Sequence, residues 1–307
     1  MNILITSASR KVSLVNDFKK AISQEGGGVV VAVDINTNSA ALYFANYYYL
    51  VPETTSPEFT GVLNRICKTH SIDAIIPTRD EELLFFSENR EEFPFVMVPS
   101  TETIRICQDK KAFIEFCGKN GFHTPEQSPY YPLFVKPRFG KGGAGATKVS
   151  SGRELDIVLE KYGDVVIQKF IDSEEYTIDL FADFESRVIS AIPRQRVVVF
   201  GGESFVTTTV MNKQLIDESC RLAIKLKLIG HNTIQAFLDD GKVKFIEVNP
   251  RYGGAAKMGF FAGAFTPIFL IRLLNGESVD SMLYDFNSDI TMLRYTNDVF
   301  IKDGVPQ

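Results

Sequence analysis

The first hundred residues alternate short, unbroken apolar runs with segments of helical periodicity, and this alternation restricts the fold more than any other feature. The predicted strands are 2–6, 28–34, 47–51, 74–77 and 95–99, and the predicted helices lie near 12–24, 61–70 and 81–89. Apolar strands that alternate with helices are typical of a parallel sheet covered on both faces. We therefore predict an α/β domain over residues 1–100, with ligands at the carboxyl ends of its strands.

Charged side chains follow two of these strand ends. Arg10 follows the first strand, and Arg79 and Asp80 follow the strand at 74–77. They are candidates for substrate contacts because ligands meet such a sheet at this edge, although local bonds within the loops explain each of them equally well. Asp34 stands where a ribose-binding acid would, but no G-x-G-x-x-G follows the first strand, which argues against a dinucleotide domain.

The sequence pattern changes after residue 100. A helix is predicted within 100–121, and from Leu133 onward several segments have the period-2 alternation of half-buried strands. These strands are 134–139, 146–149, 165–171, 176–181 and 189–193, and further helices are predicted at 154–162, 215–227 and near 267–274. Strands of this kind indicate antiparallel sheet, so we expect residues 101–307 to form a second, α+β region.

Composition argues against several classes of protein. The 307 residues carry a net charge of −5 with a pI near 5.4, whereas nucleic-acid-binding proteins usually have a basic excess. The longest apolar stretch, 255–269, contains Lys257 and Pro267 and is too short to cross a bilayer, and no signal peptide is evident. We therefore expect a cytoplasmic protein that binds neither nucleic acid nor membranes.

The four cysteines and three histidines add little chemistry. The cysteines have no C-x-x-C spacing, so we expect structural thiols in a reducing compartment rather than disulfides or a zinc site. So few histidines also leave little support for a Ser-His or Cys-His nucleophile.

A glycine-rich stretch, F-V-K-P-R-F-G-K-G-G-A-G-A-T-K-V (134–149), is the first motif that indicates chemistry. Glycine lets backbone N–H groups wrap phosphate oxygens that a Cβ would obstruct. A strand-like segment follows the loop instead of a helix, which argues against a dinucleotide fold, and Ala-Thr after Gly145 excludes a Walker loop. What remains is a glycine loop that joins two antiparallel strands over a nucleotide, as in kinases.

Basic residues around this loop favour phosphate binding over the alternative, a flexible hairpin tip. Lys136 lies in the strand before the loop and would bring a positive charge to the phosphates. The glycines are Gly140, Gly142, Gly143 and Gly145, and the other basic residues are Arg138, Lys141 and Lys148.

A second motif, K-F-I-E-V-N-P-R (244–251), places polar residues at alternate positions of a strand. Residues two apart on a strand share a face. We therefore expect one side to carry Phe245, Glu247, Asn249 and Arg251.

The turn D-D-G at 239–241 joins this strand to the one before it, which contains Gln235. Directly opposed residues of an antiparallel pair face the same side. A two-residue turn would place Gln235 opposite Ile246, on the other face. We therefore predict a three-residue connection, 240–242, which places Gln235 opposite Glu247.

Gln235, Glu247 and Asn249 would then form a cluster of oxygen ligands. Hard oxygen donors with few full charges suit Mg²⁺, which keeps water ligands and also binds nucleotide phosphates. Arg251 beside them has a fixed, planar charge that suits a transferred phosphoryl group or an acyl phosphate. A polar, solvent-facing hairpin is the alternative, and the glycine loop makes it the less favoured one.

Taken in order, Lys136, the glycine loop, Q-K-F-I-D-S-E-E-Y (168–176) and F-I-E-V-N-P-R resemble the ATP-grasp superfamily. The resemblance is strongest to the ATP-binding lobes of the carbamoyl phosphate synthase large chain, in which a G-D/E-S segment similar to F-G-G-E-S-F-V-T-T-T-V (200–210) also occurs. It implies a pre-ATP-grasp α/β domain over 1–100 and a two-lobed antiparallel ATP-grasp domain over 101–307, with a small lobe at about 125–172 and a large lobe at about 173–307.

The resemblance also implies roles for single residues. Lys110, with Lys111 as the alternative, and Lys136 would bind phosphates, and Lys136 and Arg251 would also act in catalysis. Glu175 matches the ribose-binding position. The remaining positions are Gly142 and Gly143 at the phosphates, Gln168, Lys169, Phe170 and Ile171 in the adenine-binding hinge, and Gln235, Glu247 and Asn249 at the metal.

Two further arginines, Arg194 and Arg196 in I-P-R-Q-R-V, are candidates for a substrate carboxylate or the transferred phosphate. We expect one of the two to be a surface residue at a strand edge. Gln235 differs from the Glu of many family members but agrees with the carbamoyl phosphate synthase pattern, which implies that one metal ion is held more weakly.

The family implies an ATP-dependent reaction with Mg²⁺ or Mn²⁺, in which a carboxylate is phosphorylated and an amine attacks the acyl phosphate. Such catalysis works by positioning and charge neutralisation, so it needs no side-chain nucleophile. We therefore expect a carboxylate–amine ligase that acts on small molecules. A homodimer is one possible assembly. The alternatives are a split subunit like carbamoyl phosphate synthase, a phosphotransferase, and an ATP-binding sensor without turnover.

Overall fold

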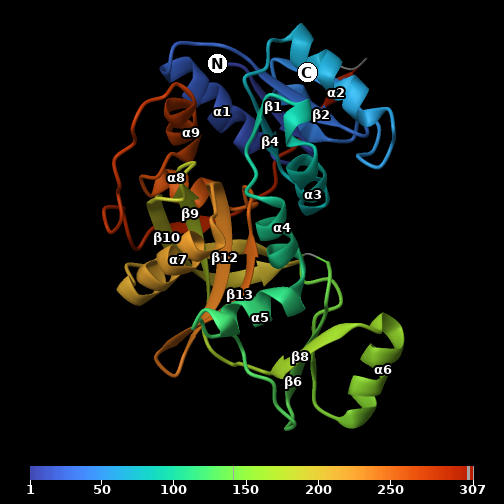
Figure 1. The fold of residues 1–307 in the computed structure, drawn as a ribbon, viewed down its shortest axis with the longest axis vertical. Coiled ribbons are helices and arrows are strands. Elements are labelled where there is room, and N and C mark those ends of the chain that lie inside the picture. The colour runs from blue at the N-terminus through green and yellow to red at the C-terminus, as the bar shows by residue number, and fades with distance from the viewer. Residues whose placement is uncertain (141, 303–304, 307) are drawn as a thin grey trace.

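The computed structural model describes residues 1–307 except 141, 303–304 and 307. The N-terminal sheet lies at one end of the molecule, a long antiparallel sheet lies in the middle, and a small sheet lies at the other end (Figure 1). The order in space differs from the order along the chain, because the small sheet precedes the long antiparallel sheet in the sequence but lies beyond it in space.

The N-terminal sheet has five parallel strands, and the predicted parallel α/β domain is confirmed. In sheet order the strands are β3 (Tyr47–Leu50), β2 (Val30–Asp34), β1 (Ile3–Thr6), β4 (Ala74–Pro77) and β5 (Phe95–Val96). The central strand β1 pairs with β2 on one side and with β4 on the other. Because the chain moves outward from β1 in both directions, a topological switch point lies between β1 and β4.

Helices cover both faces of this sheet. Helix α1 (Val12–Gln24) has apolar residues at helical spacing and packs on one face together with α9 (Thr266–Leu274), which comes from the other end of the chain. Helices α2 (Phe59–Thr69) and α3 (Asp80–Glu88) pack on the opposite face. Short 3₁₀ turns follow β2 and α3, at Ala40–Phe44 and Arg90–Glu92.

Two helices, not the single helix predicted within 100–121, connect the first sheet to the rest of the chain. They are α4 (Thr101–Gln108) and α5 (Lys110–Lys119). Asp109 between them accepts hydrogen bonds from the backbone N–H groups of Lys111 and Ala112, at 3.0 and 3.3 Å, and so starts a new helix.

The small sheet has the order β7-β6-β8, and one helix packs against it. Its elements are β6 (Leu133–Pro137), β7 (Thr147–Val149), α6 (Gly152–Tyr162) and β8 (Val165–Lys169). The glycine loop joins the antiparallel strands β6 and β7, as predicted.

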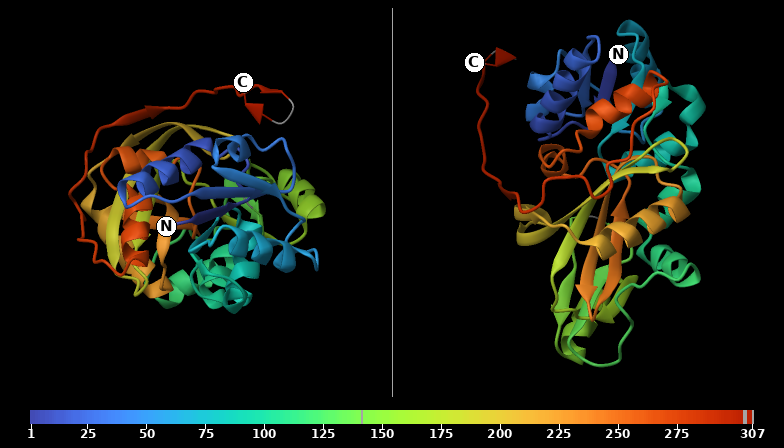
Figure 2. Two further views of the ribbon diagram at one scale, coloured as in Figure 1. Left: turned by 90° about the horizontal axis from the view of Figure 1, so that it is seen from above. Right: turned by 90° about the vertical axis from the view of Figure 1, so that its left-hand side faces the viewer.

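The six-stranded sheet is antiparallel, as predicted, and has the order β13-β12-β9-β10-β11-β14. Its strands are β9 (Glu175–Ala182), β10 (Val188–Phe200), β11 (Glu203–Thr209), β12 (Gly230–Asp239), β13 (Lys242–Asn249) and β14 (Thr291–Leu293). Helices α5 and α7 (Lys213–Leu226) share a hydrophobic core with this sheet, and α8 (Lys257–Phe261) follows β13. After β14 the chain runs along the outside of the molecule to a short hairpin, β15 (Ile301–Lys302) and β16 (Val305–Pro306) (Figure 2).

The β12–β13 turn has two residues, so the predicted three-residue connection is wrong. Asp239 pairs with Lys242, which leaves Asp240 and Gly241 in the turn with φ angles of 49° and 69°. Two consecutive residues with positive φ are the requirement of a type I′ turn, whose twist matches that of a hairpin.

The predicted pairing of Gln235 with Glu247 is nevertheless confirmed. The register shifts between this pair and the next one, Ala236 with Phe245, so Ile246 is an extra residue on β13. The bulge restores the pairing that the shorter turn would have prevented. It also turns Phe245 into the buried core and away from Glu247, contrary to our prediction.

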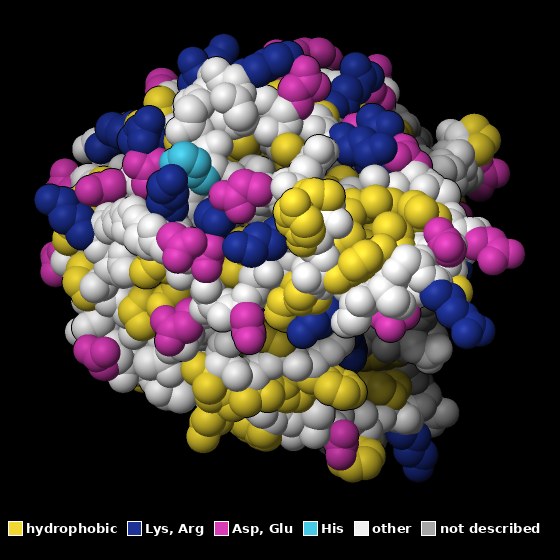
Figure 3. Space-filling view, turned by 90° about the horizontal axis from the view of Figure 1, so that it is seen from below, with side chains coloured by type: hydrophobic (Ala, Val, Ile, Leu, Met, Phe, Trp, Pro, Cys, Tyr) yellow, Lys and Arg dark blue, Asp and Glu magenta, His cyan; other side chains and the backbone are white. Residues whose placement is uncertain are grey.

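Charged side chains of both signs lie intermingled on the face at the small-sheet end of the molecule, next to patches of hydrophobic side chains (Figure 3). None of the described helices is long and apolar enough to span a bilayer.

Candidate active site

Charged side chains from several segments surround Glu247 on strand β13. Asn249, two residues further along, donates from its amide nitrogen to Glu247 Oε1 at 2.9 Å. The charge of Glu247 also acts on the ammonium groups of Lys110 and Lys136, where it opposes the effect of burial on their pKa values. The hairpin and the two predicted phosphate-binding lysines therefore lie in one cluster.

Lys136 lies on β6 and is 5% exposed. Burial lowers its pKa to about 8, although the negative charges of Glu247 and Glu175 raise it. Among the described residues, none accepts a hydrogen bond from its ammonium group. A buried lysine in this state is stabilised by an anion, and a nucleotide phosphate would supply one.

Lys110 is the first residue of α5 and donates from Nζ to the carbonyl oxygen of Gly140 at 3.0 Å. Burial lowers its pKa, while Glu247 raises it. The neighbouring Lys111 points elsewhere, to an exposed ion pair with Asp164 at 2.5 Å. Of the two candidates, Lys110 is the one that lies at the cluster.

The glycine loop reaches across to the β10–β11 hairpin. Its glycines have φ angles between 62° and 112°, which side chains rarely tolerate. A Cβ at Gly202 in the hairpin would lie 2.5 Å from the carbonyl oxygen of Gly142, whereas Cβ atoms at Gly142 and Gly143 would meet nothing within 4 Å. The loop backbone at Gly142 is thus packed against Gly202 of the hairpin, whereas the space next to the Cα atoms of Gly142 and Gly143 is free of protein atoms. Lys141 lies outside the described residues.

Glu175, Arg196 and Gln235 form a second part of the cluster. Arg196 Nε lies 3.1 Å from Glu175 Oε1. In the orientation that satisfies its amide, Gln235 donates to Glu175 Oε1 at 3.3 Å and accepts from Arg196 Nη1 at 3.1 Å. Burial raises the pKa of Glu175 and lowers the pKa of Arg196, and each group's charge opposes the shift of the other.

The donor set at the hairpin fits a magnesium ion that takes part of its coordination from phosphate. Glu247 offers a carboxylate, and Asn249 keeps its amide oxygen free because its nitrogen makes the bond to Glu247. The described residues contain no group of three His, Cys, Asp or Glu side chains suited to a metal. Few protein charges with oxygen ligands and added waters and phosphates are the arrangement that Mg²⁺ prefers.

Arg251 connects the hairpin to the N-terminal domain. It donates from Nε and Nη2 to the two carboxylate oxygens of Asp80, at 2.7 and 2.6 Å. This two-bond ion pair fixes the guanidinium plane. The opposite edge, Nη1 and Nη2, keeps donors for an oxyanion, since among the described residues its one other hydrogen bond is a long one of 3.4 Å to the carbonyl of Tyr252.

The predicted adenine hinge lies at the end of β8. Gln168 is buried and donates from its side chain to the carbonyl of Pro125 at 2.6 Å. The backbone N–H groups of Lys169 and Phe170 donate to carbonyl oxygens of the segment before β6, at 2.8 and 3.1 Å. These donors are therefore engaged within the chain, and Ile171 next to them is buried.

Arg194 is not at a surface edge, so that expectation is wrong. It is 2% exposed, because β10 lies inside the six-stranded sheet. Its Nε donates to Asp179 at 2.8 Å and its Nη1 to Ser204 at 3.2 Å, which leaves it little capacity for substrate. Arg196 is buried as well, with its side chain 7% exposed.

Arg10 and Arg79 lie at the carboxyl edge of the N-terminal sheet. The Arg10 side chain is 85% exposed and lies 3.4 Å from Glu203, whereas the Arg79 side chain is 42% exposed and lies 3.3 Å from Glu81. Lys11, which sequence reasoning missed, is the basic residue after β1 that turns inward. The doublet Arg10-Lys11 directly before α1 was the available signal.

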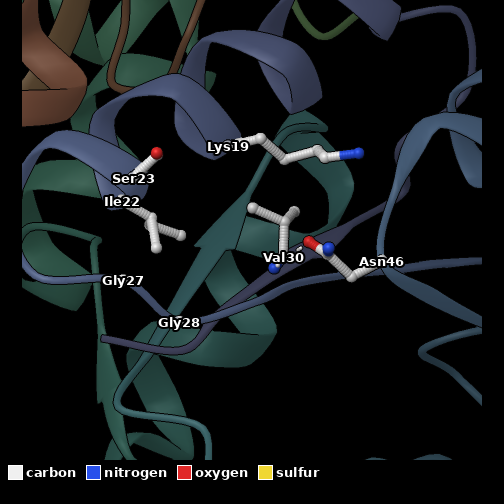
Figure 4. Close-up of a pocket in the computed structure, with 7 residues that line it drawn as sticks. All are labelled: Lys19, Ile22, Ser23, Gly27, Gly28, Val30 and Asn46. Carbon is white, nitrogen blue, oxygen red and sulfur yellow. Dashed lines mark hydrogen bonds between the residues drawn. The ribbon is translucent and has the colours of Figure 1, made fainter.

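A pocket of about 270 Å³ lies elsewhere, at the opposite edge of the parallel sheet (Figure 4). Its lysine and asparagine are already bonded within the chain. Lys19 donates to the carbonyl of Phe44 at 2.9 Å, and Asn46 accepts from the N–H of Val30 at 2.9 Å. This pocket is therefore not part of the cluster around Glu247.

Comparisons with known proteins identify the families of the two regions. Residues 3–100 match the PylC-like N-terminal domain family, and residues 107–255 match the ATP-grasp domain family. The crystal structure of a biotin carboxylase β,γ-ATP complex from Campylobacter jejuni superposes with a TM-score of 0.75, at 17% identity, over 94% of this chain and 74% of that one.

Two curated relatives extend the comparison to whole enzymes. The arginine-specific carbamoyl phosphate synthase large chain of Bacillus subtilis is 24% identical over an alignment of 258 residues, and the match covers 74% of this chain and 25% of that protein. The 3-methyl-D-ornithine–L-lysine ligase of Methanosarcina acetivorans is 24% identical over 268 residues, 85% of this chain and 71% of that protein. The chain thus spans a quarter of the first relative and most of the second.

Proposed function

We propose that this chain, which belongs to the ATP-grasp superfamily, is an ATP-dependent ligase that joins a small-molecule carboxylate to an amine. The single observation that carries the proposal is the meeting of Lys110 and Lys136 with the Glu247–Asn249 pair. Two amines for phosphates next to oxygen donors for a divalent cation are the parts that phosphoryl transfer requires.

In this mechanism Lys110, Lys136 and the glycine loop bind the phosphates of ATP. Glu247 and Asn249, with Gln235 beside them, would hold Mg²⁺ or Mn²⁺, which supplies charge neutralisation at the transferred phosphoryl group. The free edge of Arg251 orients that group and the substrate carboxylate.

The proposed reaction has two steps. A carboxylate oxygen attacks the γ-phosphorus of ATP, ADP leaves, and an acyl phosphate forms. The amine then attacks the acyl carbon, loses a proton, and phosphate leaves with the bonding electrons of the C–O bond. Arg196 lies close to Glu175 and Gln235 and adds a positive charge beside the hairpin.

The ligase of Methanosarcina acetivorans supports this assignment over a split carbamoyl phosphate synthase subunit, because its match covers more of both chains. We propose small-molecule substrates on the same basis, and a cytoplasmic location because the cysteines are free thiols. The domain limits of about 1–100 and 101–307 and an assembly as a homodimer are part of the proposal.

The test is a screen of carboxylate and amine pairs for ADP release with Mg²⁺ and ATP. A ligase releases ADP and phosphate at a rate that depends on both substrates. A stable phosphorylated product would identify a phosphotransferase instead, and ATP binding without hydrolysis for every pair would identify a sensor. Either of these two results would overturn the proposal.

A further inference from the structure

Two basic side chains at the carboxyl edge of the N-terminal sheet take no part in the proposed phosphoryl transfer. Lys11 lies between β1 and α1, and Arg79 lies between β4 and α3. The strands β1 and β4 are hydrogen-bonded neighbours, with Thr6 paired to Pro77, so both residues flank the switch point of the sheet. Open α/β sheets bind ligands at this position.

The electrostatics around Lys11 are those of a site with excess positive charge. Burial and then the charge of Arg251 lower its pKa to about 8, and Arg79 contributes in the same direction. Glu82 and Asp34 oppose these effects without cancelling them.

The acidic side chains nearby already accept hydrogen bonds or form ion pairs within the chain. Glu82 is buried and accepts from Thr6 Oγ1 at 2.8 Å and from the hydroxyl of Ser7, and burial raises its pKa. Asp34 accepts from backbone N–H groups at 2.8 Å. Asp80 is held in the ion pair described above. Each of the three carboxylates therefore has hydrogen-bond partners within the chain.

In the described part of the chain the Lys11 ammonium makes no hydrogen bond and no ion pair. Within the same described residues Arg79 has one ion-pair partner, Glu81, at 3.3 Å, and the side chain of Glu81 is half exposed. Both groups therefore keep donors for an anion, and a guanidinium beside an ammonium suits a carboxylate.

One ion pair joins this basic pair to the reaction centre. Arg251 lies two residues after Asn249 on the hairpin, and its partner Asp80 directly follows Arg79. The Arg251–Asp80 ion pair therefore links the hairpin to the segment that carries Arg79.

We propose that Lys11 and Arg79 bind a second carboxylate of the substrate, so that the enzyme acts on a dicarboxylate. One carboxylate is activated beside Glu247 and Arg251, and the other is held by Lys11 and Arg79. This inference rests on the proposed ligase function for the identity of the first carboxylate.

The test is calorimetric titration of the full chain, without nucleotide, with succinate, glutarate and adipate, and with butyrate as the single-carboxylate control. We expect saturable binding of at least one diacid and no comparable binding of butyrate. Lys11→Met should weaken diacid binding at least about tenfold, since a charge-assisted hydrogen bond is lost. Lys11→Arg should restore it, and Lys20→Met, an exposed lysine on the same helix, should leave it unchanged. Absence of diacid binding, equal binding of butyrate, or unchanged binding by Lys11→Met would overturn the proposal.

ADP release in the same samples separates this proposal from the ligase assignment. Diacid binding that depends on Lys11 without amine-dependent ADP release would contradict the ligase function and retain the carboxylate site. Amine-dependent turnover of a diacid with an unchanged KM in Lys11→Met would contradict the carboxylate site and retain the ligase. We expect Lys11→Met to raise the KM for the diacid with little change in kcat or in the KM for ATP.

Discussion

Lys136 and Lys11 differ in their surroundings. Lys136 is buried, whereas Lys11 is half-buried. Lys136, on the small sheet, has carboxylates near it, from Glu247 and Glu175. Lys11, on the N-terminal domain, has the guanidinium groups of Arg251 and Arg79 near it. Burial lowers the pKa of both lysines to about 8.

The two lysines therefore have the same lowered pKa in two different electrostatic environments. Around Lys136 opposite charges are mixed, which suits phosphates together with a divalent cation. Around Lys11 positive charge is in excess, which suits an anion without a metal. Each of the four predictions below changes either the mixed-charge side around Lys136 or the basic side around Lys11 and leaves the other unchanged.

The largest effect is expected at the mixed-charge side, for Glu247→Ala. Loss of this carboxylate removes a metal ligand and leaves two lysine charges unopposed. We expect turnover to fall at least about 100-fold, the size of effect seen when a charge-stabilising group is lost. Steady-state ADP release measures it, with the exposed Glu277→Ala as the matched control. Full activity in Glu247→Ala would remove the basis of the metal assignment.

Lys136→Met should have two opposite effects. Affinity for Mg-ATP should fall about 10- to 100-fold, since charge-assisted hydrogen bonds to phosphate are lost. The ligand-free protein should melt at a higher temperature at pH 7. Folding lowers the pKa of Lys136 from 10.5 to about 8, because the charged ammonium is less stable when buried than in water. Below pH 8 this charge therefore reduces the free energy of unfolding. The destabilisation disappears as the pH rises from about 8 to 10.5, where the lysine is neutral in both states.

Titration calorimetry and thermal melting measure the two effects of Lys136→Met. Lys20→Met serves as the control because that lysine is exposed. A lower melting temperature together with weaker ATP binding would mean that Lys136 stabilises the fold rather than binding phosphate.

The basic side should respond to pH. Diacid affinity should weaken about tenfold as the pH rises from about 7 to about 9.5, because Lys11 loses its proton above its pKa of about 8. The other charged groups that act on Lys11 are Arg251, Arg79, Glu82 and Asp34. The affinity of Lys11→Arg should be constant over the same range. An identical decline in both proteins would assign the pH dependence to another group.

The smallest effect is expected where the glycine loop meets the β10–β11 hairpin. Gly202→Ala places a methyl group 2.5 Å from the carbonyl oxygen of Gly142, at a φ of 76°, so the loop has to shift. We expect the KM for ATP to rise about two- to fivefold, with diacid binding unchanged. Gly61→Ala is the matched control, because a Cβ there meets nothing within 4 Å. An unchanged KM for ATP in Gly202→Ala would show that this contact does not position the loop.

The sequence predicts the N-terminal domain well because its signals are local. Each strand from Ile3–Thr6 to Phe95–Val96 is a short apolar run, and each helix repeats apolar residues at helical spacing. The hairpin was harder, because its register depends on a turn and a bulge together. The Asp240-Gly241 pair indicates a two-residue turn, but the sequence of the strand does not indicate the bulge at Ile246.

Side-chain direction was the least predictable feature of the site. Arg10 and Lys11 are neighbours in the sequence, yet Arg10 is exposed and Lys11 turns inward. Arg194 donates to Asp179 on the neighbouring strand β9, a residue 15 positions away in the sequence. Such choices depend on tertiary neighbours and not on the residue's own segment.

The most direct test of this account is a crystal structure of the full chain with Mg²⁺ and the non-hydrolysable ATP analogue β,γ-imido-ATP. We predict the metal ion on Glu247 and Asn249, the phosphates on Lys110 and Lys136, and the γ-phosphate facing Arg251. A nucleotide bound away from this hairpin, or a metal ion without Glu247 among its ligands, would contradict the account.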